Sequence, residues 1–585
     1  MNKLQSQPFQ INSKWLNYIK ENNDSLVESC LLFPEFLSKI NIVKVTLLLR
    51  EFYMNNADIK PYASFNELRQ IVYKHIQTSR NERMIIKLAD AYDGYQFYLP
   101  AFLDFRGRIY RSGILHFHER DLARSMIMFA DQSDNNFNYN IAYYNICIAT
   151  SFLYKSSISE KEAINWFLNI MDDINSNKNP DDYLFKKASE AKRSFQFLAN
   201  MLILKDIKSI SEIQNYNLFI LNTPLTQDAS ASAYQIMSYF LLDESMAMRT
   251  NLIPHPCHNE IQDVYSYMLE ELKEFINSEL QDNNLSKTIN GILTRKIAKG
   301  IFMPMIYGKT LMSTACDLKR DLSSFITNKE CFELASICFK FWKTKYSHME
   351  CLIRLIRHIG WIVSASDRIV NYNAKNLITV QNYTKIEPIN IWIYDKMNKK
   401  RRRVTLRVSS DKKDTRKTET STFVNFIHQK DANIAMNVVE SLMKNYNDCP
   451  IYTVHDNFIT TAKYNKRLSE FYSYAIKSMG NPLVIINSFI WKNVILPPIL
   501  AGKAEVTNKP DWDSWVFTRE ALFYYLIANI PDNLSYQMKK TWNERISGVI
   551  SSYENYILCG NTFIGHERKW NEFKGKVRCQ YCVHY

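Results

Sequence analysis

The sequence predicts an α+β protein, mainly α, with a smaller β-containing part. Apolar residues recur at helical spacing through three long stretches, residues 1–100, 140–205 and 260–345. Three short segments have the alternation and turn residues of strands, namely 101–130, 218–230 and 450–462. A chain of 585 residues can form two or three cores at about 150 residues per domain. We therefore expect two or three hydrophobic cores, with helices predominating over strands.

The charge balance favours a polyanionic partner. The formal net charge is +14 and the pI about 9.0. Neutralising phosphates releases counterions, so this excess is typical of nucleic-acid binding, although a solvated basic surface has the same composition. The eleven cysteines follow no regular framework, which is typical of reduced thiols in an intracellular setting. The apolar run around 485–500 is broken by Lys492 and two prolines, so we expect no membrane span.

Glycine is scarce, at 13 residues, whereas Tyr, Phe, Ile, Asn and Lys are abundant. These five residue types have AT-rich codons, which favours an organellar or plasmid gene.

The first half of the chain alternates between the two predicted structures. Residues 1–100 should be mainly helical, with one turn near Lys60-Pro61. The letters FLDFRGRIY, within 101–130, should form strand, turn and strand, and helices return through 140–205. The β-like run LFILNTPLTQDAS at 218–230 then leads into the helical AYQIMSYFLLDE.

Residues 292–310, ILTRKIAKGIFMPMIYGKT, predict a helix with a chemically unusual stripe. Arg295, Lys299, Met303 and Tyr307 are spaced four apart and share one broad side. The two cations can neutralise a polyphosphate, Tyr307 offers a ring and a hydroxyl, and Gly308 allows a close backbone approach. An ordinary amphipathic helix with a glycine cap is the alternative.

Two aspartates are candidate metal ligands. Asp228 follows the β-like run and Asp456 lies in the predicted hairpin PIYTVHDNFITTA at 450–462. Acids at strand ends are rigid enough to hold two metal ions about 3.5–4 Å apart, as phosphoryl transfer requires. Taken singly, each is as typical of a turn or a helix cap.

The segment 396–417 is the most basic part of the chain, with eleven basic and two acidic residues. Its alternating RVTLRVSS predicts a β-hairpin arm, and we expect Arg401, Arg402 and Arg403 to contact nucleic acid. A solvated loop or a localisation signal is the alternative. A helix should follow at 430–446, and the tail after the 450–462 hairpin should be helical.

Five motifs in order resemble those of phage-type single-subunit RNA polymerases, including the mitochondrial and mitochondrial linear-plasmid enzymes. They are DFRGRIY (104–110), D-x-S-x-S-x-x-Q (228–235), R-x3-K-x7-YG (295–308), NFIHQKD (425–431) and HDNF (455–458). The resemblance covers roughly residues 85–500. It implies a right-hand polymerase fold with thumb, palm and fingers, and DNA-templated RNA synthesis.

The resemblance also implies domain boundaries. These are a thumb-like region (1–100), the first part of the palm (101–240), the fingers (241–395), a basic arm like the specificity hairpin (396–420), the second part of the palm (421–505), and a C-terminal extension and foot (506–585).

Residue roles follow from the same resemblance. Asp228 and Asp456 match the metal-binding aspartates, Ala229 would lend a backbone carbonyl to a metal, and His455 would support Asp456. Arg295 and Lys299 match the pair that grips the triphosphate, with Lys299 the proton donor to pyrophosphate. The remaining matches are Tyr307 and Gly308 at the insertion site, His428 near the nascent base pair, and Asp104, Arg106 and Arg108 on the hybrid.

The resemblance implies two Mg²⁺ ions as cofactors, double-stranded DNA, nascent RNA and ribonucleoside triphosphates as partners, and a mitochondrial location. About 100 residues precede the DFRGR motif, fewer than in phage relatives, so a separate promoter-melting factor is a further expected partner.

Three positions favour ribonucleotides over the deoxyribonucleotides of family-A DNA polymerases, which share the R-x3-K…YG helix. Those enzymes place glutamate five residues after the first aspartate, where this chain has Ala233. They place an acid after the second aspartate and an aromatic residue four after the lysine, where Asn457 and Met303 stand here. A DNA polymerase and a decayed, non-catalytic nucleic-acid-binding relic are the alternatives.

Several residues differ from the motifs of this polymerase family, and two clusters resemble metal sites instead. Pro304 should clash with the carbonyl of Gly300, so we expect a kink or a helix that starts late. Ala229 and Ala233 replace family glycines. HPCH (255–258) contains zinc-ligand residue types without a second ligand pair near it. The terminal CQYCVHY (579–585) has a CxxC with Cys559 and His566 upstream, so zinc binding is an alternative there, but we interpret it as an aromatic foot.

Overall fold

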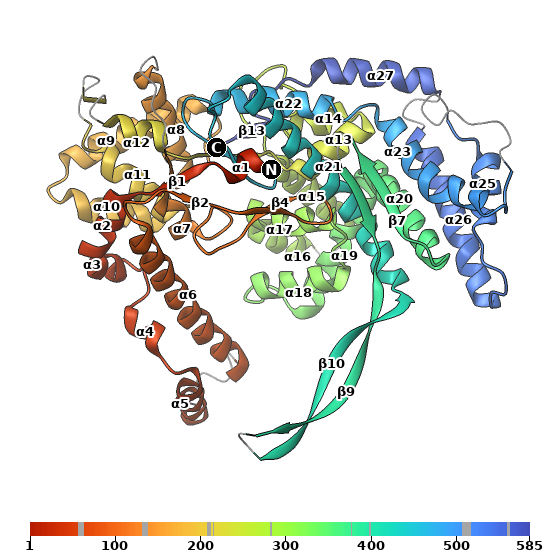
Figure 1. Ribbon diagram of the computed structural model, residues 1–585, viewed down its shortest axis with the longest axis horizontal. Helices are drawn as coiled ribbons and strands as arrows, with labels where there is room; N and C mark the ends of the chain where they lie inside the picture. Colours follow the sequence, from red (N-terminus) through yellow and green to blue (C-terminus); the bar gives the residue numbers. More distant parts are fainter. Residues whose placement is uncertain are drawn as a thin grey trace.

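The computed structural model describes residues 1–56, 64–130, 138–207, 212–213, 216–280, 283–375, 377–396, 399–505, 516–557 and 562–585. Helices dominate these residues, and the strands form small sheets of two to four members. The α+β class is therefore confirmed. In Figure 1 a broad body carries two projections on the same side, one formed by α4–α6 and one by the hairpin β9–β10.

The N-terminal part forms the helical projection. Ser64 and Glu67 close the first turn of α6 with a capping box, which satisfies N–H groups that have no partner in the helix. The expected turn at Lys60-Pro61 lies outside the described residues. The elements are α1 (Asn2–Gln5), β1 (Pro8–Ile11), α2 (Ser13–Glu21), α3 (Asn23–Glu28), α4 (Glu35–Lys39), α5 (Ile42–Asn55) and α6 (Phe65–Tyr92).

The strand–turn–strand prediction around DFRGR is confirmed, because β3 (Ala101–Leu103) pairs antiparallel with β4 (Ile109–Arg111). A three-stranded sheet β2-β1-β5 was not predicted. The other elements of this part are β2 (Phe97–Tyr98), α7 (Asp121–Met126), β5 (Ile127–Phe129), α8 (Tyr139–Tyr154), α9 (Glu160–Ser176), α10 (Pro180–Glu190) and α11 (Ser194–Leu204).

The prediction for 218–230 is wrong in its first half. A helix, α12 (Asn217–Asn222), precedes the strand β6 (Leu225–Ala229). A short apolar run is compatible with a buried helix or a buried strand, so its pattern alone could not decide.

A four-stranded antiparallel sheet lies at the centre of the fold, in the order β11-β12-β6-β13. β11 (Tyr452–Val454) and β12 (Asn457–Thr460) form the predicted hairpin. β13 (Val583–His584), from the far end of the chain, pairs with the other edge of β6. Successive residues of a strand point to opposite faces, and accordingly Phe458 and Ile459 pack into two different hydrophobic cores.

The predicted helical region 260–345 is confirmed. Its helices and their neighbours are α13 (Ser232–Leu241), α14 (Glu244–Arg249), α15 (Val264–Glu279), α16 (Asn283–Ile292), α17 (Arg295–Met305), α18 (Leu311–Leu322), α19 (Asn328–Lys345) and α20 (Ser347–Ala365).

The basic arm is a hairpin, as predicted, but its boundaries differ. It comprises β9 (Thr384–Asp395) and β10 (Lys400–Lys413) rather than 396–420. Residues from Thr415 onward belong to α21 (Thr415–Asn445), because the Asp414 side chain accepts from Lys417 N and caps that helix. A second hairpin, β7 (Val370–Ala374) and β8 (Leu377–Gln381), precedes the arm.

The tail is helical, as predicted. It contains η3 (Asn465–Arg467), α22 (Leu468–Lys477), α23 (Pro482–Ile490), the π-helix η4 (Trp491–Ile495), α24 (Leu496–Leu500), α25 (Arg519–Ala528), α26 (Tyr536–Ile557) and α27 (Phe563–Lys576). The continuous stretch Pro482–Leu500 is long and apolar enough to cross a membrane, despite the interruptions noted in the sequence. Half of it is buried inside the protein, a pattern that core helices share, so it is weak evidence for a span.

Candidate functional site

The central sheet brings the two candidate metal ligands together. Asp228 in β6 lies opposite Asn457 in β12, the residue after Asp456. The Ala229 N–H donates to the Asp456 carbonyl at 3.2 Å. Asp228 in β6 and Asp456 in the turn before β12 therefore lie at the same end of the sheet.

Asp456 lies at the tip of the β11–β12 turn. The preceding His455 has a φ of +60°, a left-handed conformation that costs a non-glycine residue free energy. The rings of Tyr110 and His118 contact the His455 ring edge-on, with centroids 5.0 and 5.7 Å away. These contacts support the turn that carries Asp456.

The surroundings of Asp228 disfavour its negative charge. Desolvation by the surrounding protein, with the charge of Asp456, raises its pKa to about 7, while the positive charges of Lys299, Lys192 and Arg124 act in the opposite direction. Two neighbouring carboxylates supply the oxygen ligands that a hard cation such as Mg²⁺ prefers. In the described part of the chain no group of three or more His, Cys, Asp or Glu could hold a metal. Further ligands would thus come from backbone, water or substrate oxygens.

The predicted phosphate-gripping helix begins at Arg295, with Thr294 as its N-cap. The Arg295 guanidinium binds Asp263 through two hydrogen bonds, of 2.5 and 2.8 Å. Burial acts to raise the pKa of Asp263, but the bonds from Arg295 and Ser266 hold it below its ordinary value. Lys299 Nζ lies 5.6 Å from the centre of the Tyr265 ring.

The end of this helix differs from the predicted stripe. α17 does not start late, and it ends at Met305, so Tyr307 lies in the turn beyond it, before Gly308 with its φ of +81°. Pro304 is the penultimate helical residue and has no N–H to offer the Gly300 carbonyl. Lys309 Nζ donates to that carbonyl instead, at 3.2 Å.

Helix α21 connects the DFRGR turn to the Tyr307 ring. Arg106 Nη1 lies 2.8 Å from His428 Nδ1, and the rings of His428 and Tyr307 are 5.3 Å apart. Burial, with the nearby charges of Arg108 and Arg106, lowers the pKa of His428 to about 2. The imidazole is therefore neutral, and since guanidinium only donates, Nδ1 accepts and Nε2 carries the proton.

The DFRGR turn is itself held by ion pairs. Asp104 binds Arg106 at 2.5 Å, and Arg108 binds the buried Asp431 of α21 at 2.7 Å. Gly107 has a φ of +90°, and a Cβ there would lie 2.6 Å from Leu377. The turn thus needs glycine for both conformation and space.

The other predicted residues lie apart from this cluster. Ala233 lies in the first turn of α13 and is 5% exposed, within the main core. Arg401 and Arg403 lie opposite Tyr394 and Trp392 on one face of the arm. Arg402 lies on the other face, opposite Ile393.

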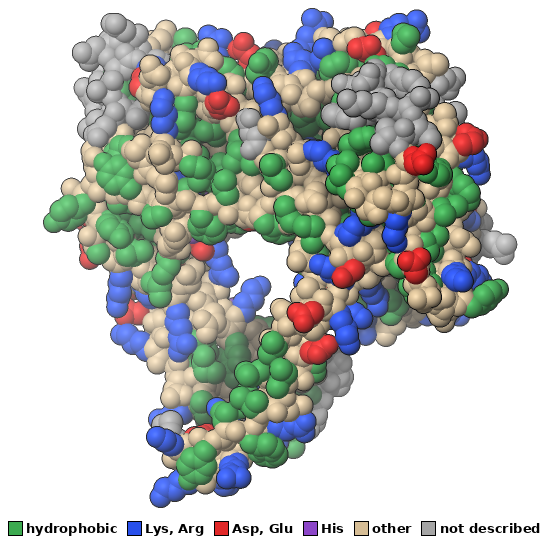
Figure 2. Space-filling view, turned by 45° about the vertical axis from the view of Figure 1, so that its right-hand side comes forward, with side chains coloured by type: hydrophobic (Ala, Val, Ile, Leu, Met, Phe, Trp, Pro, Cys, Tyr) green, Lys and Arg blue, Asp and Glu red, His purple; other side chains and the backbone are tan. Residues whose placement is uncertain are grey.

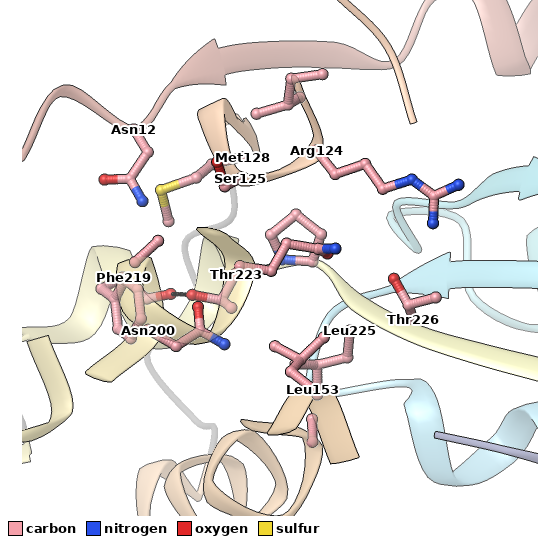
Figure 3. A pocket seen from close by; sticks show the side chains of 15 residues that line it. Asn12, Arg124, Ser125, Met128, Leu153, Asn200, Phe219, Thr223, Leu225 and Thr226 are labelled. Carbon is pink, nitrogen blue, oxygen red and sulfur yellow. Dashed lines mark hydrogen bonds between the residues drawn. The ribbon is translucent and has the colours of Figure 1, made fainter. Parts of the chain in front are cut away.

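Sequence reasoning missed two cations beside Asp228, Lys192 and Arg124, because nothing in their local pattern marks them. Figure 3 shows the Arg124 side chain extending from α7 toward Thr226 of β6. The cavity drawn there measures about 40 Å³, room for a few water molecules. It is too small for a nucleotide.

The C-terminal strand was also missed as a neighbour of the site. His584 lies opposite Asp228 in the sheet, and His584 Nε2 is 3.0 Å from Ser230 Oγ. Cys579 and Cys582 are buried, and Cys582 Sγ donates to the Ser469 carbonyl at 3.3 Å.

The space below the central body is open and lined by cations. Figure 2 shows an opening flanked by the two projections, with Lys and Arg side chains on both sides. The aspartate pair, the Arg295–Lys299 helix and this basic opening together form the kind of site that polymerases of nucleic acids use.

Comparison with known proteins agrees with this class. A family model described as DNA-dependent RNA polymerase matches residues 138–475. The chain belongs to this DNA-dependent RNA polymerase family.

Individual relatives carry similar names. A "Probable DNA-directed RNA polymerase" of Zea mays is 34% identical over 85% of this chain and 48% of its own length. One of Agaricus bitorquis is 25% identical, over 76% of this chain and 42% of its own. A "DNA-directed RNA polymerase, mitochondrial" of Neurospora crassa is 24% identical, over 42% and 17%. The chain spans about half the length of the first two.

Proposed function

We propose that this chain catalyses DNA-templated RNA synthesis from ribonucleoside triphosphates. The observation that supports the proposal best is the proximity of Asp228, in β6, to Asp456, in the turn that leads into the adjacent strand β12, within electrostatic reach of Lys299. In the reaction the RNA 3′-hydroxyl oxygen bonds to the α-phosphorus, and the bond from that phosphorus to the β-phosphate oxygen breaks, releasing pyrophosphate.

Each residue of the site has a role in this proposal. Asp228, Asp456 and the Ala229 carbonyl would hold two Mg²⁺ ions, which when bound neutralise phosphate charge and favour the ionised hydroxyl. Arg295 and Lys299 bind the triphosphate, and Lys299 gives a proton to pyrophosphate as it leaves.

The neighbouring groups orient the nucleotide and the hybrid. The Tyr307 ring stacks beside the insertion site, next to the backbone of Gly308, and the neutral His428 directs its Nε2–H toward the nascent pair. Asp104, Arg106 and Arg108 contact the growing end of the hybrid. Arg401, Arg402 and Arg403 of the arm contact the DNA.

The architecture proposed is a right hand, with α4–α6 in the thumb, the central sheet in the palm and α17 in the fingers. Two projections on the same side of the body, with an opening between them, support it (Figure 1). The names of the mitochondrial relatives support action in mitochondria on an organellar or plasmid genome. A separate promoter-melting factor is part of the proposal.

The sugar preference separates this proposal from a DNA polymerase. Ala233 leaves the position of an excluding glutamate empty, and Asn457 and Met303 lack the acid and the aromatic ring of DNA polymerases. Ala233 is only 5% exposed. A ribose can therefore contact its methyl group only if the nucleotide binds directly against the first turn of α13.

Extension of a primed RNA–DNA scaffold by the purified chain tests the proposal. We expect addition of matched ribonucleotides with Mg²⁺ and a much lower kcat/KM for deoxyribonucleotides. A preference for deoxyribonucleotides would identify a DNA polymerase. Scaffold binding without any addition would identify a non-catalytic nucleic-acid-binding protein.

A further inference from the structure

Lys430 is a buried ammonium group without a carboxylate. It lies on α21 with 2% of its surface exposed. Its Nζ donates to the Asn373 carbonyl at 2.8 Å and to Gln429 Oε1 at 3.0 Å, and lies 4.7 Å from the Phe426 ring. No Asp or Glu of the described chain forms an ion pair with it. Lysine is almost never fully buried unless it is paired.

A second lysine adds to the charge. Lys492, half-buried on the π-helix η4, also has no acidic partner among the described residues, and burial lowers its pKa. Burial, with the charge of Lys492, lowers the pKa of Lys430 to about 7. Two neighbouring cations without a counter-charge are destabilising unless an anion joins them.

Both lysines line an open pocket of about 270 Å³ between β7, α21 and α23–η4. Lys375 is a third lining cation, and no Asp or Glu lines the pocket. Lys430 follows His428 by two residues, about 200° around the helix. The pocket therefore lies on the opposite side of α21 from the candidate active site.

Asn433 also lines this pocket. It is 2% exposed, and its Oδ1 is buried without a hydrogen-bond partner among the described residues. Because an amide oxygen only accepts, this atom requires a donor such as a water molecule and does not itself indicate an anion.

We propose that this pocket binds a phosphate group through Lys375, Lys430 and Lys492. A phosphate dianion supplies the missing counter-charge and oxygen acceptors for three ammonium groups, which bind phosphate as point charges. Ser488, also in the lining, offers a hydroxyl donor. This site is separate from the triphosphate helix and does not rest on the proposed polymerase activity.

The test compares the thermal unfolding midpoint in inorganic phosphate and in chloride at equal ionic strength, at pH 7. We expect phosphate to raise the midpoint of the full chain and of Lys345→Gln, a matched loss of an exposed lysine elsewhere. We expect Lys492→Gln to weaken phosphate binding about tenfold, the size of one lost charged hydrogen bond. Lys430→Met should have a similar effect. If Lys430→Met does not fold, Lys492→Gln still tests the proposal, because Lys492 is only partly buried and its replacement should be tolerated.

Phosphate can also bind at the candidate active site, so Lys299→Gln is measured in parallel. A phosphate effect lost in Lys299→Gln but kept in Lys492→Gln overturns the proposal. The source of the phosphate group is tested with duplex DNA. A further outcome is that free phosphate has no effect while Lys492→Gln lowers the slope of log affinity for duplex DNA against log salt concentration by about one. In that case the phosphate group that the pocket binds belongs to a nucleic acid. If neither measurement changes, the pocket binds no phosphate and the proposal is wrong.

Discussion

Asp228 and Asp456 repel each other, and basic side chains from three other segments offset that repulsion. Lys299 comes from α17, Arg124 from α7, and Lys192 from the segment before α11. These cations can also neutralise phosphate oxygens near the sheet. In the proposed function the carboxylates serve the chemical step and most of the cations serve affinity.

Asp456→Asn should abolish nucleotide addition while scaffold binding stays nearly unchanged. The amide keeps the shape of the turn but loses the charge that a metal requires, which should cost several kcal/mol of transition-state stabilisation, at about 1.4 kcal/mol per tenfold in rate. Single-turnover extension and scaffold affinity measure the two effects. A rate above about a tenth of wild type would show that Asp456 is not a metal ligand.

Asp263→Asn should raise KM for the nucleotide severalfold with little change in kcat. The two bonds to Asp263 use Arg295 Nε–H and one Nη2–H, and leave the other N–H groups for a triphosphate. Without the carboxylate, the half-exposed Arg295 side chain loses this orientation before the nucleotide binds.

Ser266→Ala is the matched control, because it removes a hydroxyl that donates to Asp263 and leaves the ion pair intact. Steady-state kinetics on the primed scaffold provide both constants. An unchanged KM in Asp263→Asn, or an equal change in Ser266→Ala, would show that Asp263 does not orient Arg295.

The sequence predicts functional residues whose side-chain chemistry fits a short motif. It does not predict which distant residues contact them in the folded protein. Asp228 and Asp456 were predicted to lie near each other, since acids at strand ends with metal-site chemistry implied it. Asp263 and Asp431 pair with Arg295 and Arg108 across 32 and 323 residues. Such pairs have no local signal.

At the scale of elements, the arm is a hairpin with two chemically different faces. Residues directly opposite in an antiparallel pair share a face. One face carries the pairs Trp392–Arg403 and Tyr394–Arg401. The other carries Ile389–Leu406 and Ile391–Val404, with the charged pair Asp395–Lys400 toward the tip. Only the first face combines rings and guanidinium groups, as nucleic-acid contacts commonly do.

Replacing Arg401 and Arg403 by Gln should reduce preference for a promoter duplex over a random duplex, while elongation on a primed scaffold is spared. The control removes the same charge from the other face, with Lys400→Gln and Arg402→Gln. Both double variants should reduce the salt dependence of duplex binding by the same amount. Only the Arg401/Arg403 variant should lose the preference for promoter DNA over random DNA. Equal loss in both would mean that the arm acts through charge alone.

Element boundaries were less predictable than element types. The sequence placed Tyr307 on the helical stripe of Arg295, but Pro304 and Gly308 end the helix at Met305. The sequence predicts that the arm starts at 396, where the run of charged residues begins. The first strand of the arm, β9, begins instead at Thr384 and is largely apolar and exposed. Charge patterns mark one strand of a hairpin and give no sign of its partner.

At the scale of the whole molecule, the central sheet joins two cores. Phe458 belongs to the core of α13 and the C-terminal helices, and Ile459 to the core of β1, β5, α8 and α11. The strand pair that carries the aspartates is thus packed on both faces. Packing on both faces makes the sheet a rigid base, whereas the two projections extend from it into solvent (Figure 1).

Scaffold binding should depend steeply on salt, and the chemical step should not. The chain carries a net charge of +14, and its cations line the opening between the projections (Figure 2). If about six phosphates are neutralised there, affinity should fall about 10³-fold between 50 and 200 mM salt. The aspartates and Lys299 interact at short range within the folded protein, where mobile ions screen less than between charges a Debye length apart. Single-turnover extension at saturating scaffold should therefore keep its rate across the same range. Affinity that hardly changes with salt would mean that the basic opening is a solvated surface, and a rate that falls in parallel with affinity would mean that binding and chemistry share the same charges.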